Sequence, residues 1–123
     1  MRVKVKLSTD DIKHFETFLN EPLIRTKKTA IRMAIALGLS KMAEGEGLKL
    51  SGNEVFKFNT ATIDPEGVFE VVAYYTIAKR LGASTNTKKI IVTKKDEIAE
   101  TIAEAFVLGL KDITKLQWPG SFI

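Results

Sequence analysis

The chain opens with a strict alternation of basic and aliphatic side chains. The even positions are basic and the odd positions aliphatic, with Arg2, Lys4 and Lys6 set between Val3, Val5 and Leu7. Because successive side chains of a strand point to opposite faces, an extended backbone puts all three cations on one side. The pattern predicts a short strand with a cationic face.

Apolar residues then recur at helical spacing. A first helix is predicted from about Thr9 to Asn20, with Ser8 or Thr9 as its N-cap. Its apolar stripe consists of Ile12, Phe15, Phe18 and Leu19. Pro22 follows closely, and the residue before a proline is pushed out of the helical region, so the helix ends there.

A second helix is predicted from the N-cap Thr26 to about Glu44, where Gly45 and Gly47 stop it. Its apolar residues cover more than one face: Ala30, Ile31, Met33, Ala34, Ile35, Leu37, Gly38, Leu39 and Met42. A helix with that much apolar surface lies either at the centre of the core or in a dimer interface.

The chain divides at Gly45, and the second half predicts further helix. Residues 54–58 alternate and indicate a short strand. Asp64 and Pro65 are typical of a helix start, with the aspartate as cap and the proline at the first helical position, and this helix extends to about Leu81. It is apolar nearly all round, through Val68, Phe69, Val71, Val72, Tyr74, Tyr75, Ile77 and Ala78.

A polar loop at 82–87 and a short apolar run at 88–92 precede the last helix. Thr93 and Asp96 have the spacing of a capping box that opens it. One face of this helix is apolar, with Ile98, Ile102, Ala105, Phe106, Gly109, Leu110 and Ile113.

These elements predict a mainly α fold in a single domain over residues 1–123. Residues 1–44 form a short N-terminal strand plus two helices, the layout of a ribbon-helix-helix DNA-binding module. Residues 45–123 add two long helices with at most short strands, and we expect them to serve packing and oligomerisation. A chain of this size has limited room to bury both all-round apolar helices, so we expect a stable dimer or tetramer.

The charge is concentrated in the first half. Residues 1–50 hold ten basic and six acidic side chains, a balance of +4, whereas residues 51–123 hold nine of each. This asymmetry favours a nucleic-acid or other anionic partner. The alternative interpretation is that the lysines are solvated and only keep the protein in solution.

Residues for catalysis are scarce. The chain has no cysteine, which excludes disulfides and thiolate chemistry, and His14 is its only histidine. Glu97, Glu100 and Glu104 share a helical face, as an acid–base or metal pair would, but a solvated face has the same spacing. Trp118, near the end, is either a docking anchor or part of a folded-back tail. We expect no enzyme, cofactor or metal site.

No apolar run approaches the roughly 18 residues of a membrane span. The basic N-terminus is not followed by the apolar segment of a secretory signal. These observations predict a cytoplasmic protein without a membrane partner.

The segment Thr26-Lys-Lys-Thr-Ala-Ile-Arg32 resembles the Ser-Arg-Ser-Glu-Ala-Ile-Arg signature of ribbon-helix-helix regulators and antitoxins, and it departs from it at Lys28 and Thr29. The resemblance implies that two N-terminal strands pair into an antiparallel ribbon in the major groove. It also implies that the start of the second helix lies against phosphate and that a palindromic operator is recognised.

A second resemblance covers more of the chain. Thr26 to Leu39, with Arg32, Ala34 and Leu37 in register, is similar to a segment of the DndE family, which accompanies DNA phosphorothioation. Lys57-Phe-Asn59, the apolar helix from Phe69 to Leu81 and the ending Leu108-Gly-Leu110 are similar in order and spacing to its second half. The chain departs at Lys27, where the family often has proline, and at Asp64 to Gly67, where it usually has a Gly-Glu turn.

The DndE resemblance implies a small helical protein that binds double-stranded DNA, preferring nicked duplex, and that oligomerises. It would be a non-catalytic accessory working with other proteins of a DNA-modification system. Without cysteine, the chain cannot be the sulfur carrier. A protein-interaction module without DNA binding is a further alternative.

Both resemblances predict DNA binding by the N-terminal half. The residues expected to contact DNA are Arg2, Lys4, Lys6, Arg25, Lys27, Lys28 and Arg32. Lysine is a point charge suited to phosphate, whereas arginine can also read base edges. Arg2 is the only arginine of the strand, so the composition favours phosphate contacts over base recognition.

Overall fold

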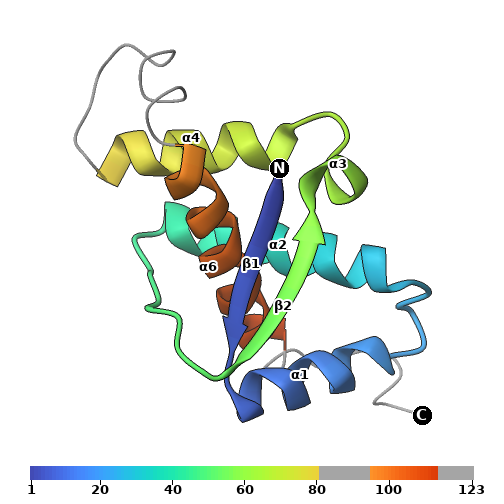
Figure 1. Ribbon diagram of the computed structural model, residues 1–123. Coiled ribbons are helices and arrows are strands. Elements are labelled where there is room, and N and C mark those ends of the chain that lie inside the picture. Colours follow the sequence, from blue (N-terminus) through green and yellow to red (C-terminus); the bar gives the residue numbers. More distant parts are fainter. Residues whose placement is uncertain (81–94, 114–123) are drawn as a thin grey trace.

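In the computed structural model, which describes residues 1–80 and 95–113, the chain is mainly helical with a two-stranded antiparallel sheet (Figure 1). The elements are β1 (Arg2–Leu7), α1 (Thr9–Leu19), α2 (Lys27–Ala43), β2 (Glu54–Asn59), α3 (Thr60–Ile63), α4 (Val68–Arg80) and α6 (Lys95–Ile113). The predicted fold class, mainly α with short strands, is confirmed.

The N-terminal strand and two helices lie where the sequence predicts them, and their caps explain the boundaries. The Ser8 hydroxyl accepts a hydrogen bond from the Asp11 N–H, and the Asp11 carboxylate accepts one from the Ser8 N–H, at 3.1 and 3.0 Å. This reciprocal pair fixes the start of α1. Thr26 caps α2 with a single bond, since its hydroxyl accepts from the Thr29 N–H at 3.1 Å.

The partner of β1 corrects the expected ribbon of two N-terminal strands. β1 pairs antiparallel with β2 of the same chain, in a register that sets Val3 opposite Phe58 and Val5 opposite Phe56. The phenylalanines of β2 pack on the same inner side as the aliphatic residues of β1. The two-stranded ribbon is therefore complete within one chain.

Helix α6 is the centre of the molecule and packs against β1, α1, α2 and α4. In Figure 1 it runs behind the sheet, with α4 across its upper end and α1 below. Its predicted apolar face is buried in full, and the core is continuous from β1 to α6, on both sides of Gly45.

The backbones of α2 and α6 are in direct contact. A methyl group built on Gly38 of α2 would lie 1.7 Å from the carbonyl oxygen of Ala105, and one built on Gly109 of α6 would lie 1.7 Å from that of Ala34. The two contacts are reciprocal, because each helix contributes an alanine and a glycine four residues apart. The absence of a side chain at both glycines lets the two backbones touch.

Four phenylalanines fill the space between the sheet and the helices. The rings of Phe15, Phe56 and Phe58 all lie within 6 Å, centroid to centroid, of Phe106 on α6. Aromatic pairs at this spacing contribute about 0.5–1.5 kcal/mol each beyond their burial. This cluster ties β2 and α1 to the central helix.

The start of α4 differs from the prediction. Pro65 lies in a turn, Gly67 has a φ of 71°, and the helix begins at Val68. Asp64 still caps it, since its carboxylate accepts from the N–H groups of Val68 and Phe69 at 2.7 and 2.9 Å. The preceding turn of helix, α3, was not expected.

Several expectations lie outside the described residues: the loop at 82–87, the apolar run at 88–92, Thr93 of the capping box, and Trp118.

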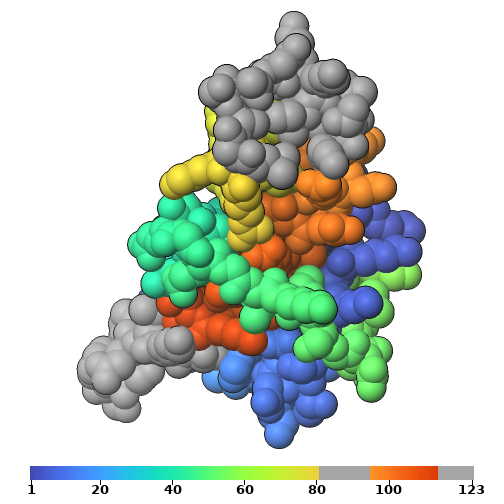
Figure 2. All heavy atoms as spheres, turned by 90° about the vertical axis from the view of Figure 1, so that its left-hand side faces the viewer, coloured from blue at the N-terminus to red at the C-terminus, as the bar shows by residue number. Residues whose placement is uncertain are grey.

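The connection from α2 to β2 crosses α6, as Figure 2 shows on the side between α4 and α1. Within this connection the Leu48 N–H donates to the Glu104 carboxylate at 3.1 Å, and the Arg80 guanidinium donates to the Glu46 carbonyl at 3.3 Å. The first bond holds the connection on the central helix, and the second ties it to the end of α4.

The contact between α2 and α6 leads to a first prediction. In Gly38→Ala the new methyl group meets backbone, which cannot rotate away as a side chain could. We expect a loss of about 1–3 kcal/mol in the free energy of unfolding, even though alanine favours a helix by about 1 kcal/mol. Urea unfolding measures it. Ser40→Ala, at an exposed position of the same helix, is the control and should be neutral or slightly stabilising. A Gly38→Ala protein as stable as the wild type would contradict the close contact.

Candidate nucleic-acid interface

The basic residues of β1 lie together on the outer face of the sheet. Arg2, Lys4 and Lys6 are exposed, whereas the intervening aliphatic residues are at most 4% exposed. The alternation predicted from the sequence is therefore confirmed. In Figure 1 the helices α2 and α6 lie behind the sheet, which leaves its outer face uncovered by the described helices.

β2 enlarges this surface with residues that the sequence analysis did not select. The register sets Asn59 opposite Arg2, Lys57 opposite Lys4, and Val55 opposite Lys6. All three are exposed. We call this surface the basic sheet face, and it consists of Arg2, Lys4, Lys6, Val55, Lys57 and Asn59. Four of its six residues are cations and none is acidic.

Lys57 could not be selected before the register was known. Its alternation with Phe56 and Phe58 indicates an outward side chain, but only the pairing of β2 with β1 puts it beside the other cations.

A second basic group lies where α2 begins. Arg25, Lys27 and Lys28, which we call the α2 basic turn, are all exposed. The Lys27 ammonium lies 4.9 Å from the centre of the Phe56 ring, a cation–π contact that sets this turn against β2.

Arg32, the remaining predicted contact, is exposed as well but has other neighbours. It lines a pocket of about 260 Å³ with Asp64, Glu66 and residues around them at the turn before α4. The structure thus joins Lys27 to the sheet and sets Arg32 apart from it.

Other basic residues are engaged in ion pairs. The Lys41 ammonium lies 3.6 Å from the Asp112 carboxylate and 3.8 Å from that of Glu46, and Asp112 is the main cause of its raised pKa. Arg80 and Glu104 are 2.9 Å apart, and this hydrogen bond raises the pKa of the guanidinium. Within residues 1–80 and 95–113, no cation of the basic sheet face forms an ion pair.

Three glutamates considered for catalysis, Glu97, Glu100 and Glu104, line one pocket of about 310 Å³ together with Arg80. Glu104 is occupied by Arg80 and the Leu48 N–H. His14 is half-buried on α1, and its Nδ1 is buried without a hydrogen-bond partner. In the part of the chain that the structure describes, no three His, Asp or Glu residues are grouped as metal ligands.

A shallow pocket of about 450 Å³ borders the basic sheet face on the β1 side. Lys4 and Lys6 lie on its rim, with Leu48 and Leu50 from the connection and Glu100 from α6. Its mixture of opposite charges does not select an anion, so we assign it no ligand.

No protein-family model matches the chain, and neither a curated protein nor a solved structure is significantly similar to it. Among the helices of the described residues, none has the length and apolar character required to cross a membrane.

The register generates a second prediction. Lys4 and Lys57 are directly opposite, and like charges in that position destabilise a sheet. Lys57→Glu replaces the repulsion by attraction and should raise the free energy of unfolding by about 0.2–1 kcal/mol at low salt. The gain should shrink in concentrated salt, which screens exposed charges. Lys13→Glu, on the exposed side of α1, makes the same change of net charge and should give no such gain; a less stable Lys57→Glu protein would refute the assigned pairing.

Proposed function

We propose that this protein binds double-stranded DNA through its backbone phosphates. The contact surface is the basic sheet face, flanked by the α2 basic turn. One observation carries the proposal: the outer face of the sheet presents four cations and no carboxylate, with two lysines directly opposite each other. A bound polyanion neutralises the repulsion that this arrangement creates.

The shape of the surface supports a duplex as the ligand. A two-stranded ribbon fits the major groove of B-DNA, which is about 12 Å wide. The sheet is a ribbon of this kind, formed by a single chain. The α2 basic turn adds charge beside β2, and the first turn of a helix has free N–H groups that bind phosphate well.

The side chains favour phosphate contacts over base recognition. Lysines supply three of the four cations, and Arg2 is the only one with a forked donor. Asn59 is the other residue suited to base edges, but its side-chain oxygen already accepts the Ala61 N–H at 2.9 Å. A face of this composition fixes a protein on DNA without carrying much sequence information.

The resemblance to the DndE family gives this activity a biological setting. On that basis we propose a cytoplasmic, non-catalytic accessory of DNA phosphorothioate modification that favours nicked duplex and acts with other proteins of the system. The absence of cysteine agrees with a role other than sulfur transfer. The alternative, a ribbon-helix-helix regulator, requires two N-terminal strands paired between chains, whereas β1 has its partner in β2.

A third prediction tests the surface. The double variant Lys4→Glu with Lys6→Glu should weaken duplex binding by an order of magnitude or more, because each lost phosphate contact also removes a released counterion. Lys57→Glu alone should weaken binding as well, although it should stabilise the fold. Fluorescence anisotropy with a labelled duplex at several salt concentrations measures both effects.

The control is again Lys13→Glu, which changes the net charge outside both basic groups. The change in log Kd caused by the double variant should be more than twice the change caused by Lys13→Glu. If six to eight cations contact phosphate, log K for the wild type should fall by about 5 to 7 per tenfold increase in salt. Equal affinity of the double variant and the wild type would remove the sheet from the interface.

A fourth prediction distinguishes the DndE-like accessory from the ribbon-helix-helix regulator. An accessory of the DndE kind should bind a nicked duplex more tightly than the intact duplex of the same sequence, and hardly distinguish one sequence from another. A ribbon-helix-helix regulator should instead prefer one palindrome by about 10³-fold or more over random duplex at equal salt. Competition binding with nicked, intact and randomised duplexes distinguishes them. Enrichment of a single palindrome with no gain from the nick would favour the regulator.

A further inference from the structure

Helix α4 keeps an apolar face that the rest of the described chain leaves exposed. Six large apolar side chains among the described residues are exposed, and four of them are on α4. They are Val68, Val71, Val72 and Tyr75, exposed by 52, 52, 38 and 61%, and we call them the α4 apolar stripe. Their spacing of three and four residues aligns them along one side of the helix.

Of the two helices that the sequence predicts to be apolar on more than one face, α2 and α4, only one has an exposed apolar face. The apolar stripe of α2 is buried within the chain, since Ala34, Ile35 and Gly38 are buried and Gly38 touches α6. On α4, by contrast, only the side with Ala73, Tyr74 and Ile77 is buried. Of these two helices, α4 alone has a substantial apolar face left for a partner.

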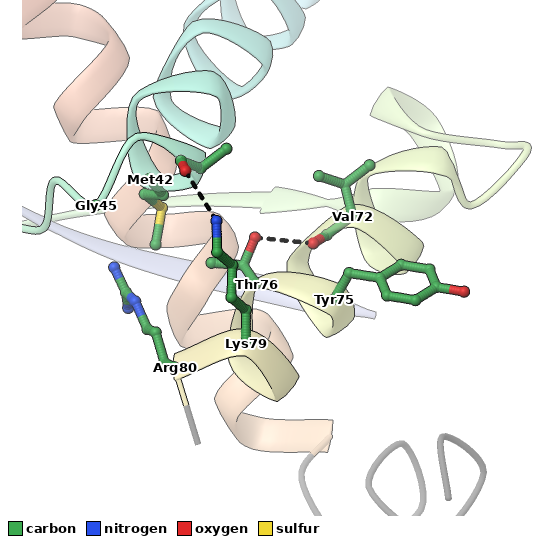
Figure 3. A pocket seen from close by; sticks show the side chains of 8 residues that line it. Met42, Gly45, Val72, Tyr75, Thr76, Lys79 and Arg80 are labelled. Atoms are coloured by element: carbon green, nitrogen blue, oxygen red, sulfur yellow. Dashed lines mark hydrogen bonds between the residues drawn. The ribbon is translucent and has the colours of Figure 1, made fainter. Parts of the chain in front are cut away.

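A groove of about 380 Å³ borders the stripe and enlarges the apolar surface. Val72 and Tyr75 form one wall, and Met42 and Ala43 at the end of α2 form the other. Figure 3 shows the Tyr75 ring directed away from the helix. The Lys79 ammonium donates to the Ala43 carbonyl at 3.3 Å.

The charges at the two ends of the stripe are complementary. Glu66 precedes α4 and is exposed, and Lys79, in its last turn, is exposed as well. An antiparallel pair of α4 helices, centred between Val71 and Val72, sets Val68 of each copy opposite Tyr75 of the other. The same geometry brings Glu66 within reach of Lys79 of the second copy, and it opposes the two helix dipoles favourably.

We propose that the α4 apolar stripe is a two-fold interface with a second copy of this chain. The same residues meet on both sides, as a closed dimer requires. Four side chains and a groove are a small surface compared with the roughly 800 Å² per partner of a standard interface. The dimer therefore dissociates on dilution. It uses α4 and leaves the basic sheet face free, so it forms without DNA.

The fifth prediction is tested first by mass, with sedimentation equilibrium of the full chain without DNA. The wild type should shift from monomer to dimer as its concentration rises into the submillimolar range. Val71→Glu should remain monomeric throughout, because burying two carboxylates at the axis is costly. Leu23→Glu, a change at a similarly exposed apolar residue outside α4, should dimerise like the wild type. A monomeric wild type, or a dimer lost only in Leu23→Glu, overturns the proposal.

Crosslinking tests the position of the axis. Since the chain has no cysteine, Val72→Cys introduces a single thiol next to the proposed axis. Mild oxidation should yield a disulfide-linked dimer in high yield, whereas Leu23→Cys should yield little. Equal yields from the two variants would overturn the interface.

Charge reversal tests the orientation and the identity of the partner. Glu66→Lys and Lys79→Glu should each weaken the dimer. Because the dimer is two-fold symmetric, each substitution changes two Glu66–Lys79 pairs. The chain with both changes should regain the affinity of the wild type, because the pairs are restored with their signs exchanged. Failure of this double variant, with circular dichroism showing it folded, overturns the antiparallel pairing. None of these measurements involves DNA, so a failure here is separate from a failure of the proposed DNA binding.

Discussion

The contact between the backbones of α2 and α6 is the constraint on which the rest of the structure depends. Gly38 and Gly109 let the two helices touch through the carbonyls of Ala105 and Ala34. Helices at this separation present one combined surface, on which α1, α4 and the sheet are arranged. Protein interiors are close-packed, so a larger separation here would open space beneath each of these elements. The sheet depends on the same central helix, because Phe56 and Phe58 pack against Phe106 of α6.

Periodicity and caps were sufficient to predict α1, α2 and the buried face of α6 from the sequence. The buried faces of α1, α2 and α6 agree with the predicted stripes, and Ser8 and Thr26 cap the helices as expected. These features are local, since each depends on residues within a few positions. The start of α4 was wrong because Asp64 caps from a distance: a turn containing Gly67 separates it from Val68, and Pro65 therefore lies outside the helix.

What the sequence did not provide is the pairing of elements distant along the chain. The alternation of β1 indicates two faces but not a partner, and β2 lies some fifty residues further on. Only that pairing shows that Lys57 lies beside the cations of β1. For α4 the difficulty is different: a helix that is apolar all round gives no indication of which side is buried, so only packing identifies the exposed stripe. The predicted cations are all exposed, yet their division between the sheet, the α2 basic turn and Arg32 also required the fold.

The basic surface and the exposed apolar surface of this chain lie on different elements, the sheet and α4. The basic sheet face sets Lys4 opposite Lys57, an arrangement that weakens the strand pair slightly and that suits the proposed binding of a polyanion. The aromatic cluster beneath compensates, since its ring contacts are each comparable to or larger than one such repulsion. An apolar surface does not bind phosphate, and the α4 apolar stripe lies on a different element from the basic sheet face. Helix α4 packs at the end of α6 that is far from α1. A chain arranged in this way can associate through α4 while the sheet remains open to a polyanion, and two copies joined at α4 would present two basic faces to one ligand. Linked sites bind more tightly than either alone when the ligand can reach both. The strength of DNA binding would then depend on protein concentration through α4, although α4 itself touches no DNA.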